Sequence, residues 1–115
     1  MALTITQLFT PVQLPAAAAV LFSMPTTAQQ PTAVLKNGRV RLTNTSAAAV
    51  PVTLYAAAAA TISAAANCCM STQSIPANSY IDVDIPTMTA GDTLRGFAGT
   101  ANVVTMHEMG GLLYS

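Results

Sequence analysis

The chain has 115 residues, of which 52% are hydrophobic and only 7% charged, and its four basic and four acidic side chains give a net charge of zero. An ordinary soluble domain carries about 25% charged residues, which keep its surface from associating. The deficit therefore predicts a surface that is covered by copies of the same chain or by a larger assembly. Four cations are too few for a nucleic-acid-binding patch, and no apolar run approaches the roughly 20 residues that cross a bilayer.

A chain of this length folds as one domain without a metal or a disulfide. Residues 1–10 carry no basic residue ahead of their apolar run, as a secretory signal would. We therefore expect the protein to stay where it is made until it assembles.

The N-terminal 15 residues are apolar and contain two prolines, Pro11 and Pro15. Strands are predicted at residues 5–9 and 18–22, with prolines marking their limits. Proline lacks the N–H that a central strand needs, so residues 1–15 can pair only at an edge. We expect an arm or edge segment over residues 1–15 that reaches a neighbouring subunit, with Leu3, Ile5 and Phe9 as interface candidates, and a sandwich domain over residues 16–115.

Alternation of apolar and polar side chains predicts strands at residues 36–43 and 50–55, each with one buried face. Between them, Asn44-Thr45-Ser46 is a turn sequence, because these side chains hydrogen-bond to their own backbone. The two strands are therefore expected to form a hairpin. The Ala-rich stretch 56–70 is ambiguous, and we interpret it as a loop with about one helical turn.

Further strands are predicted at residues 80–85, 93–98, 103–108 and 112–114, separated by Pro, Gly, Asn and Asp. Gly96 is expected to weaken the middle of one strand, and Gly110-Gly111 to separate the last two. About eight short strands without a long helix predict an all-β fold, a single β-sandwich or jelly roll.

Few residues suggest chemistry. His107 and Glu108 are adjacent on a strand, so they point to opposite faces and cannot easily act on one substrate. Asp82 and Asp84 share one strand face at about 7 Å, a spacing that a glycosidase could use. Without a Trp to stack a sugar, however, a solvated or ion-paired strand face is the better interpretation.

Arg39 and Arg41 repeat the same spacing with the opposite charge. One basic and one acidic doublet predict pairing across strands or across a subunit boundary. The alternative is that the two arginines only keep an exposed edge hydrated. All four residues, Arg39, Arg41, Asp82 and Asp84, are candidates for subunit contacts.

Cys68 and Cys69 are adjacent, without the spacing or the second ligand pair of a metal or redox site, and we expect reduced, unreactive thiols. Asn44-Thr45-Ser46 fits a glycosylation sequon, but a turn is the better interpretation. No phosphate loop, nucleophile elbow or zinc signature is present. We expect no catalytic residue, no cofactor and no metal, and hence no enzyme.

Five short segments together resemble small virion proteins of tailed bacteriophages that are built on one β-sandwich domain. They are VRLTNTS (40–46), VTLY (52–55), SIPANS (74–79), AGDTLR (90–95) and VVTMH (103–107). The resemblance covers about residues 33–108. The chain departs from the pattern of these proteins at residues 56–70, which are unusually rich in Ala and carry the cysteine pair.

The resemblance implies a capsid decoration or cement protein, a non-enzymatic component of the capsid surface that is made in the host cytoplasm. Its expected partners are itself, as a homotrimer, and the major capsid protein or other virion proteins, but neither nucleic acid nor a membrane. The alternative is a small tail, neck or fibre component of the same virion.

Overall fold

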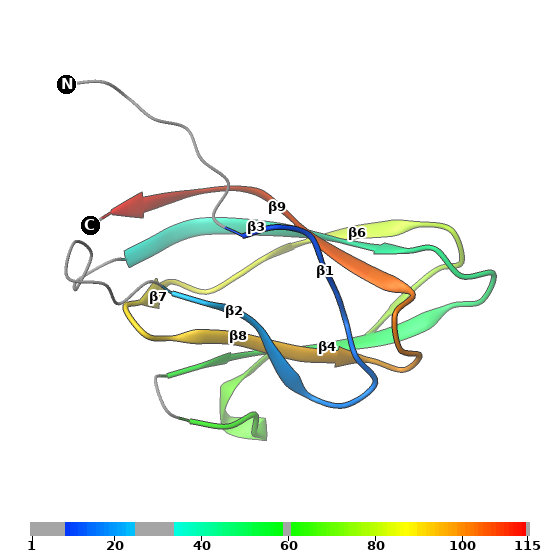
Figure 1. Ribbon diagram of the computed structural model, residues 1–115, viewed down its shortest axis with the longest axis horizontal. Coiled ribbons are helices and arrows are strands. Elements are labelled where there is room, and N and C mark those ends of the chain that lie inside the picture. The colour runs from blue at the N-terminus through cyan, green and yellow to red at the C-terminus, as the bar shows by residue number, and fades with distance from the viewer. Residues whose placement is uncertain (1–8, 25–33, 59–60, 115) are drawn as a thin grey trace.

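The computed structural model describes residues 9–24, 34–58 and 61–114, and for residues 113 and 114 it describes the backbone only. Two antiparallel sheets pack face to face (Figure 1). The first has the strand order β1-β9-β3-β6, with β7 also paired to β3, and the second has the order β2-β8-β4-β5. The strands are β1 (Val12–Gln13), β2 (Ala19–Ser23), β3 (Val34–Asn44), β4 (Val50–Ala57), β5 (Cys68–Ile75), β6 (Tyr80–Asp84), β7 (Met88–Thr89), β8 (Thr93–Ala98) and β9 (Val104–Tyr114).

The pairing is nested along the chain. β1 pairs with β9, β2 with β8, β3 with β6 and β4 with β5. If the two-residue β7 is set aside, the first of eight strands pairs with the last, the second with the seventh, and so on inward. This is a long antiparallel hairpin rolled into two four-stranded sheets, which is the jelly roll. The expected all-β fold is confirmed.

The core lies between the two sheets and is made by alternate residues of the long strands. On β3 the inward residues Val40 and Leu42 are at most 1% exposed, and on β4 Val52 and Leu54 are fully buried. Alternation exists because successive strand side chains leave on opposite faces. The described core consists of Leu14, Leu21, Phe22, Met24, Leu35, Val40, Leu42, Val50, Val52, Leu54, Ile75, Ile85, Met88, Leu94, Ala98, Val104 and Met106.

The expected hairpin between β3 and β4 is wrong, because the two strands belong to different sheets. The chain therefore crosses from one sheet to the other between β3 and β4. Asn44, fully buried at the end of β3, stabilises this crossing. Its Nδ2 donates to the carbonyls of Ala48, Ile75 and Pro76 at 2.8, 3.0 and 3.2 Å, and its Oδ1 accepts from the backbone N–H and the hydroxyl of Ser46. The side chain thus ties the turn after β3 to the end of β5 in the other sheet.

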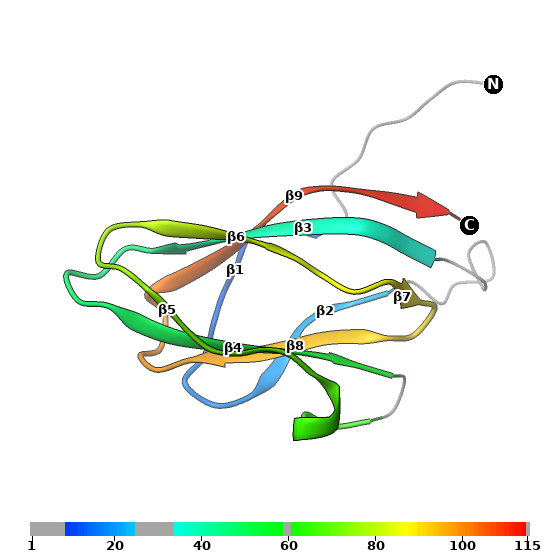
Figure 2. The ribbon, with the colours of Figure 1, turned by 180° about the vertical axis from the view of Figure 1, so that it is seen from behind.

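The Ala-rich segment is also more ordered than expected. β4 continues to Ala57, a single 3₁₀ turn, η1, covers Ala65–Asn67, and β5 follows at once as an edge strand that was not expected. Viewed from behind, η1 lies outside the four-stranded sheet (Figure 2). The segment therefore forms part of the outer surface of that sheet.

One of the two glycine predictions needs correction. β9 runs without interruption through Gly110 and Gly111, although its pairing with β3 shifts there, so the last two expected strands are one. Gly96 serves the packing of β8: a Cβ at this position would come within 2.6 Å of the Thr53 carbonyl oxygen on β4. Glycine is required there by close backbone approach.

Candidate functional site

The two charge doublets meet across neighbouring strands of the same chain. Arg39 lies opposite Asp84 and Arg41 opposite Asp82 in the register of β3 and β6. The Arg39 Nε donates to the Asp84 Oδ1 at 3.0 Å, while Arg41 donates to both Asp82 oxygens at 2.8 and 3.1 Å. The doublets were expected to pair either across strands or across a subunit boundary, and the structure shows them paired across strands.

Arg41 is the better fixed of the two cations. Its guanidinium carbon lies 4.0 Å from the centre of the Tyr80 ring, in a cation–π contact. The hydrogen bonds from Arg41 lower the pKa of the Asp82 carboxyl below its ordinary value. Because Asp82 stays ionised and is held by a bidentate cation, it cannot supply the proton that a glycosidase acid must give.

His107 and Glu108 remain apart. The register of β9 against β3 puts His107 opposite Arg41, on the outer face, and Glu108 opposite Val40, which is a core residue. The two side chains thus leave the strand on opposite faces, as expected. Within the described residues, no three His, Cys, Asp or Glu side chains are grouped as a metal site would require.

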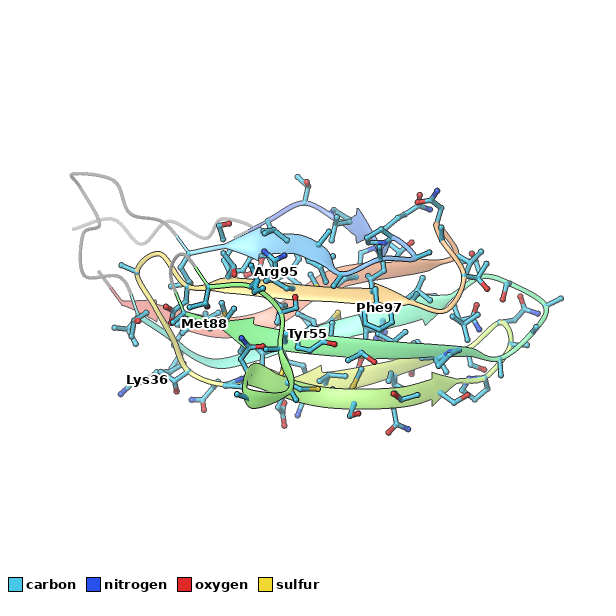
Figure 3. The ribbon with its side chains drawn as sticks, turned by 90° about the horizontal axis from the view of Figure 1, so that it is seen from below. Lys36, Tyr55, Met88, Arg95 and Phe97 are labelled. Atoms are coloured by element: carbon cyan, nitrogen blue, oxygen red, sulfur yellow. The ribbon has the colours of Figure 1, made fainter. Side chains whose placement is uncertain are left out.

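The outer face of the four-stranded sheet has a different character. Tyr55 on β4 and Phe97 on β8 stack with ring centres 6.4 Å apart, and Tyr55 lies opposite Arg95 in the register of the two strands. Figure 3 looks onto this face and labels all three. The Arg95 Nε donates to the Ser63 hydroxyl at 2.8 Å, which fastens the segment before η1 to the sheet.

A shallow hollow of about 490 Å³ opens beside the two aromatic rings. It is lined by Thr53, Tyr55, Phe97 and residues of the η1 and β5 segment, among them both cysteines. The backbone N–H of Thr72 donates a hydrogen bond of 3.1 Å to the Thr53 hydroxyl oxygen. This bond holds β5 against β4 where the register of the two strands shifts. The sequence did not indicate this surface, because β5 lacks the alternation that identified the other strands.

Cys68 and Cys69 are free thiols in the structure. Cys69 lies at the surface, but the walls of the hollow remove part of its hydration. That desolvation, with the neighbouring Cys68, raises the pKa of the Cys69 thiol above its ordinary value. A thiol that stays protonated is a poor nucleophile. For Cys69 this favours the expected unreactive thiol.

The sequon at Asn44 is closed to modification in the folded chain. Asn44 is 0% exposed, and its amide nitrogen already donates to three carbonyls. The turn interpretation is confirmed.

Among the N-terminal candidates, Leu3 and Ile5 lie outside the described residues. Phe9 is half-buried and belongs to no strand, although a strand was expected there. Its ring packs 5.0 Å from the ring of Phe22 on β2, against the core.

Comparison of the chain with protein-family models, with curated proteins and with solved structures gives no match. In the described part of the chain, no helix has the length and apolar character needed to cross a membrane.

Proposed function

We propose that the chain is a non-enzymatic structural protein of a bacteriophage particle, a decoration or cement protein that binds the outside of a capsid and stabilises it. It is made in the host cytoplasm and acts on the capsid surface, as a homotrimer in contact with the major capsid protein. The proposal rests on how the few charges are distributed.

All eight Lys, Arg, Asp and Glu side chains lie in the described residues, and six of them are on β3, β6 and β9. Asp92 is in the turn before β8, which leaves Arg95 as the single charged residue on the strands of the four-stranded sheet and on its η1 segment. A sheet face with one charge and two stacked aromatic rings has the composition of an interface centre, where charge is depleted and aromatic residues are enriched.

The topology supports the same function class. Jelly rolls build viral capsid proteins, but also lectins and cupins, so the fold alone does not decide the function. The segments that resemble phage virion proteins favour the first of these. The engagement of Asp82 by Arg41 and the separation of His107 from Glu108 count against an active site at those residues.

Quantitative densitometry of purified phage particles tests the proposal. We expect hundreds of copies per particle, in fixed ratio to the major capsid protein. A dozen copies or fewer would instead indicate a tail, neck or fibre component. Absence from the particles would overturn the proposal.

A substitution on the proposed contact face sharpens the test. Ile62 is 75% exposed beside η1, so Ile62→Lys should leave the fold intact and lower the occupancy of the protein on purified shells by roughly tenfold or more. Thr105→Lys, on the outer face of the other sheet, is the matched control and should bind normally. Equal binding of both variants would show that the four-stranded sheet is not the contact face.

A further inference from the structure

Within the described residues, one sheet edge of the sandwich is unpaired over about half the length of a strand. β3 pairs with β9 from Val104 to Tyr114, but on its other side β9 pairs with β1 only at Thr105 and Met106. Figure 1 shows β9 running on to its C-terminal arrow past the point where β1 crosses it. From residue 109 onward, no residue that the structure describes pairs with this side of β9.

The other edges of the two sheets are protected in ways that natural proteins commonly use. β6 carries two ion-paired aspartates, β2 has a register shift after Val20, and β5 is irregular, with Thr72 in a left-handed conformation at φ 49°. Charges, bulges and irregular backbone each prevent a second strand from adding.

The far half of β9 shares the irregular backbone of these edges, because its pairing with β3 shifts near Gly110 and both Gly110 and Gly111 have positive φ, but it lacks their charges. It contains no proline and no charged residue after Glu108. Met109 and Leu112, two of the five large apolar side chains that the described residues expose, lie here at 45% and 52% exposure. An exposed apolar edge of this kind is a template for strand addition.

Residues 9–11 of the same chain do not continue β1 along this edge. Continuing the register of β1 would place residues 8–10 against residues 108–110. Pro11 has no N–H to continue the ladder. Val12 and Leu14 face the core two residues apart, so Phe9 would face outward in a continued strand, yet its ring packs inward on Phe22. The alternation of a continued strand is therefore broken between residues 9 and 12.

We propose that the open edge of β9, residues 109–114, receives residues 1–8 of a second copy of the chain as an added strand. The inference rests on the self-assembly in the proposed function and names its contact. Residues 3–6 read Leu-Thr-Ile-Thr, a strict alternation of residues that favour strands, and residues 1–8 contain no Gly, Pro or charge. Eight extended residues reach about 26 Å, enough for the six residues of the edge at about 3.3 Å each.

Cysteine cross-linking in the full chain tests this contact. In a Cys68→Ser/Cys69→Ser background, one protein carries Leu112→Cys and a second, tagged protein carries a single cysteine at position 3, 4, 5 or 6. Neighbouring strands bring Cβ atoms to about 4.5–5.5 Å, within reach of a disulfide after small shifts, and the scan covers the unknown register. We expect mixing and mild oxidation to give the mixed disulfide at one or two of the four positions. Val20→Cys, equally exposed on the opposite sheet, should give at least tenfold less.

Two results would overturn the inference. A dominant disulfide between two Leu112→Cys chains would mean that β9 pairs with its own copy. A variant that carries Leu112→Cys and a cysteine at one of positions 3–6 in the same chain gives the second result. If its disulfide forms only within one chain, residues 1–8 cover the β9 edge of their own chain. Light scattering separates these failures from that of the proposed function: an oligomer without mixed disulfides leaves self-assembly standing and removes only this contact, whereas a monomer removes both.

Discussion

Asn44 is the polar residue on which the crossing between the sheets depends. Asn44→Ala removes the donor to the carbonyls of Ala48, Ile75 and Pro76, in bonds of which the one to Ile75 is buried and the other two are part-buried. Each buried group left without a partner costs about 1–3 kcal/mol, so we expect a loss of about 3 kcal/mol in the free energy of unfolding. This corresponds to a fall in Tm of roughly 12 °C for a domain of this size.

Differential scanning calorimetry at one fixed protein concentration measures that loss. Asn67→Ala is the control, because Asn67 makes similar bonds to Ala64 and Ile62 in an exposed turn and should cost under about 1 kcal/mol. Asn44→Asp keeps the shape but not the donor, and it should be at least as damaging as Asn44→Ala. If Asn44→Asp melts like the native protein, the amide donor is not what holds the crossing.

The Arg41–Asp82 pair predicts a specific pH dependence. Because its pKa is lowered in the folded chain, Asp82 stabilises the fold above the ordinary Asp value of about 3.9, and this stabilisation is lost as the pH falls through the lowered pKa. The Tm of Asp82→Asn should therefore lie below that of the native protein at pH 7 and approach it near pH about 2.

Asp84→Asn is the matched comparison. The side chains of Arg39 and Asp84 are 55% and 76% exposed, against 33% and 32% for Arg41 and Asp82. Solvent weakens the more exposed pair, so Asp84→Asn should shift Tm less at pH 7. A larger shift for Asp84→Asn would contradict this account of the two pairs.

At the scale of the elements, the sequence predicted those strands in which apolar and polar side chains alternate, because this alternation indicates one buried face. β3, β4, β6 and β8 were all expected to within a few residues, because each alternates between core and surface. β5 was missed because the hydrophobic signal is weak at an edge: Ile75 is the one residue of this strand in the buried core. The two-residue strands β1 and β7 are too short to show any period.

The continuity of β9 depends on its two glycines, and they are not equivalent. Gly110 and Gly111 have φ of 148° and 150°, a region that other residues avoid. A Cβ at Gly111 would lie 3.1 Å from the Gly38 Cα and the Leu35 side chain, while one at Gly110 would meet nothing within 4 Å. Both alanine variants should lose stability, and Gly111→Ala should lose about 1–3 kcal/mol more because of overpacking.

Urea unfolding at fixed protein concentration compares these two variants. The midpoint for Gly111→Ala should be the lower, with an unchanged slope. Equal midpoints would mean that the approach of β9 to Gly38 does not constrain the strand.

At the scale of the whole molecule, the sequence predicted a sandwich of two sheets but not the order in which the strands join those sheets. Asn44-Thr45-Ser46 is a turn in either arrangement, so local residues could not reveal that β3 and β4 separate into different sheets. The doublets Arg39/Arg41 and Asp82/Asp84 were expected to pair, and they do so across β3 and β6. The aromatic face at Tyr55 and Phe97 arises only when β4 and β8 become neighbours, a contact between residues far apart in the chain.

The proposed contacts assign different roles to two surfaces. An arm from one copy on the β9 edge of the next is a heterologous contact, and such contacts close into rings when the rotation allows. The outer face of the four-stranded sheet, with Arg95 as its single charge, would then remain available to the capsid. Neither contact depends mainly on ion pairs.

The molar mass of the purified full chain at micromolar concentration, measured by light scattering after size exclusion, tests self-assembly most directly. We expect a trimer of about 35 kDa, three times the 11.8 kDa of one chain. The mass should persist at about 1 M salt, where exposed ion pairs are screened. A single species of 11.8 kDa at both salt concentrations would contradict the account.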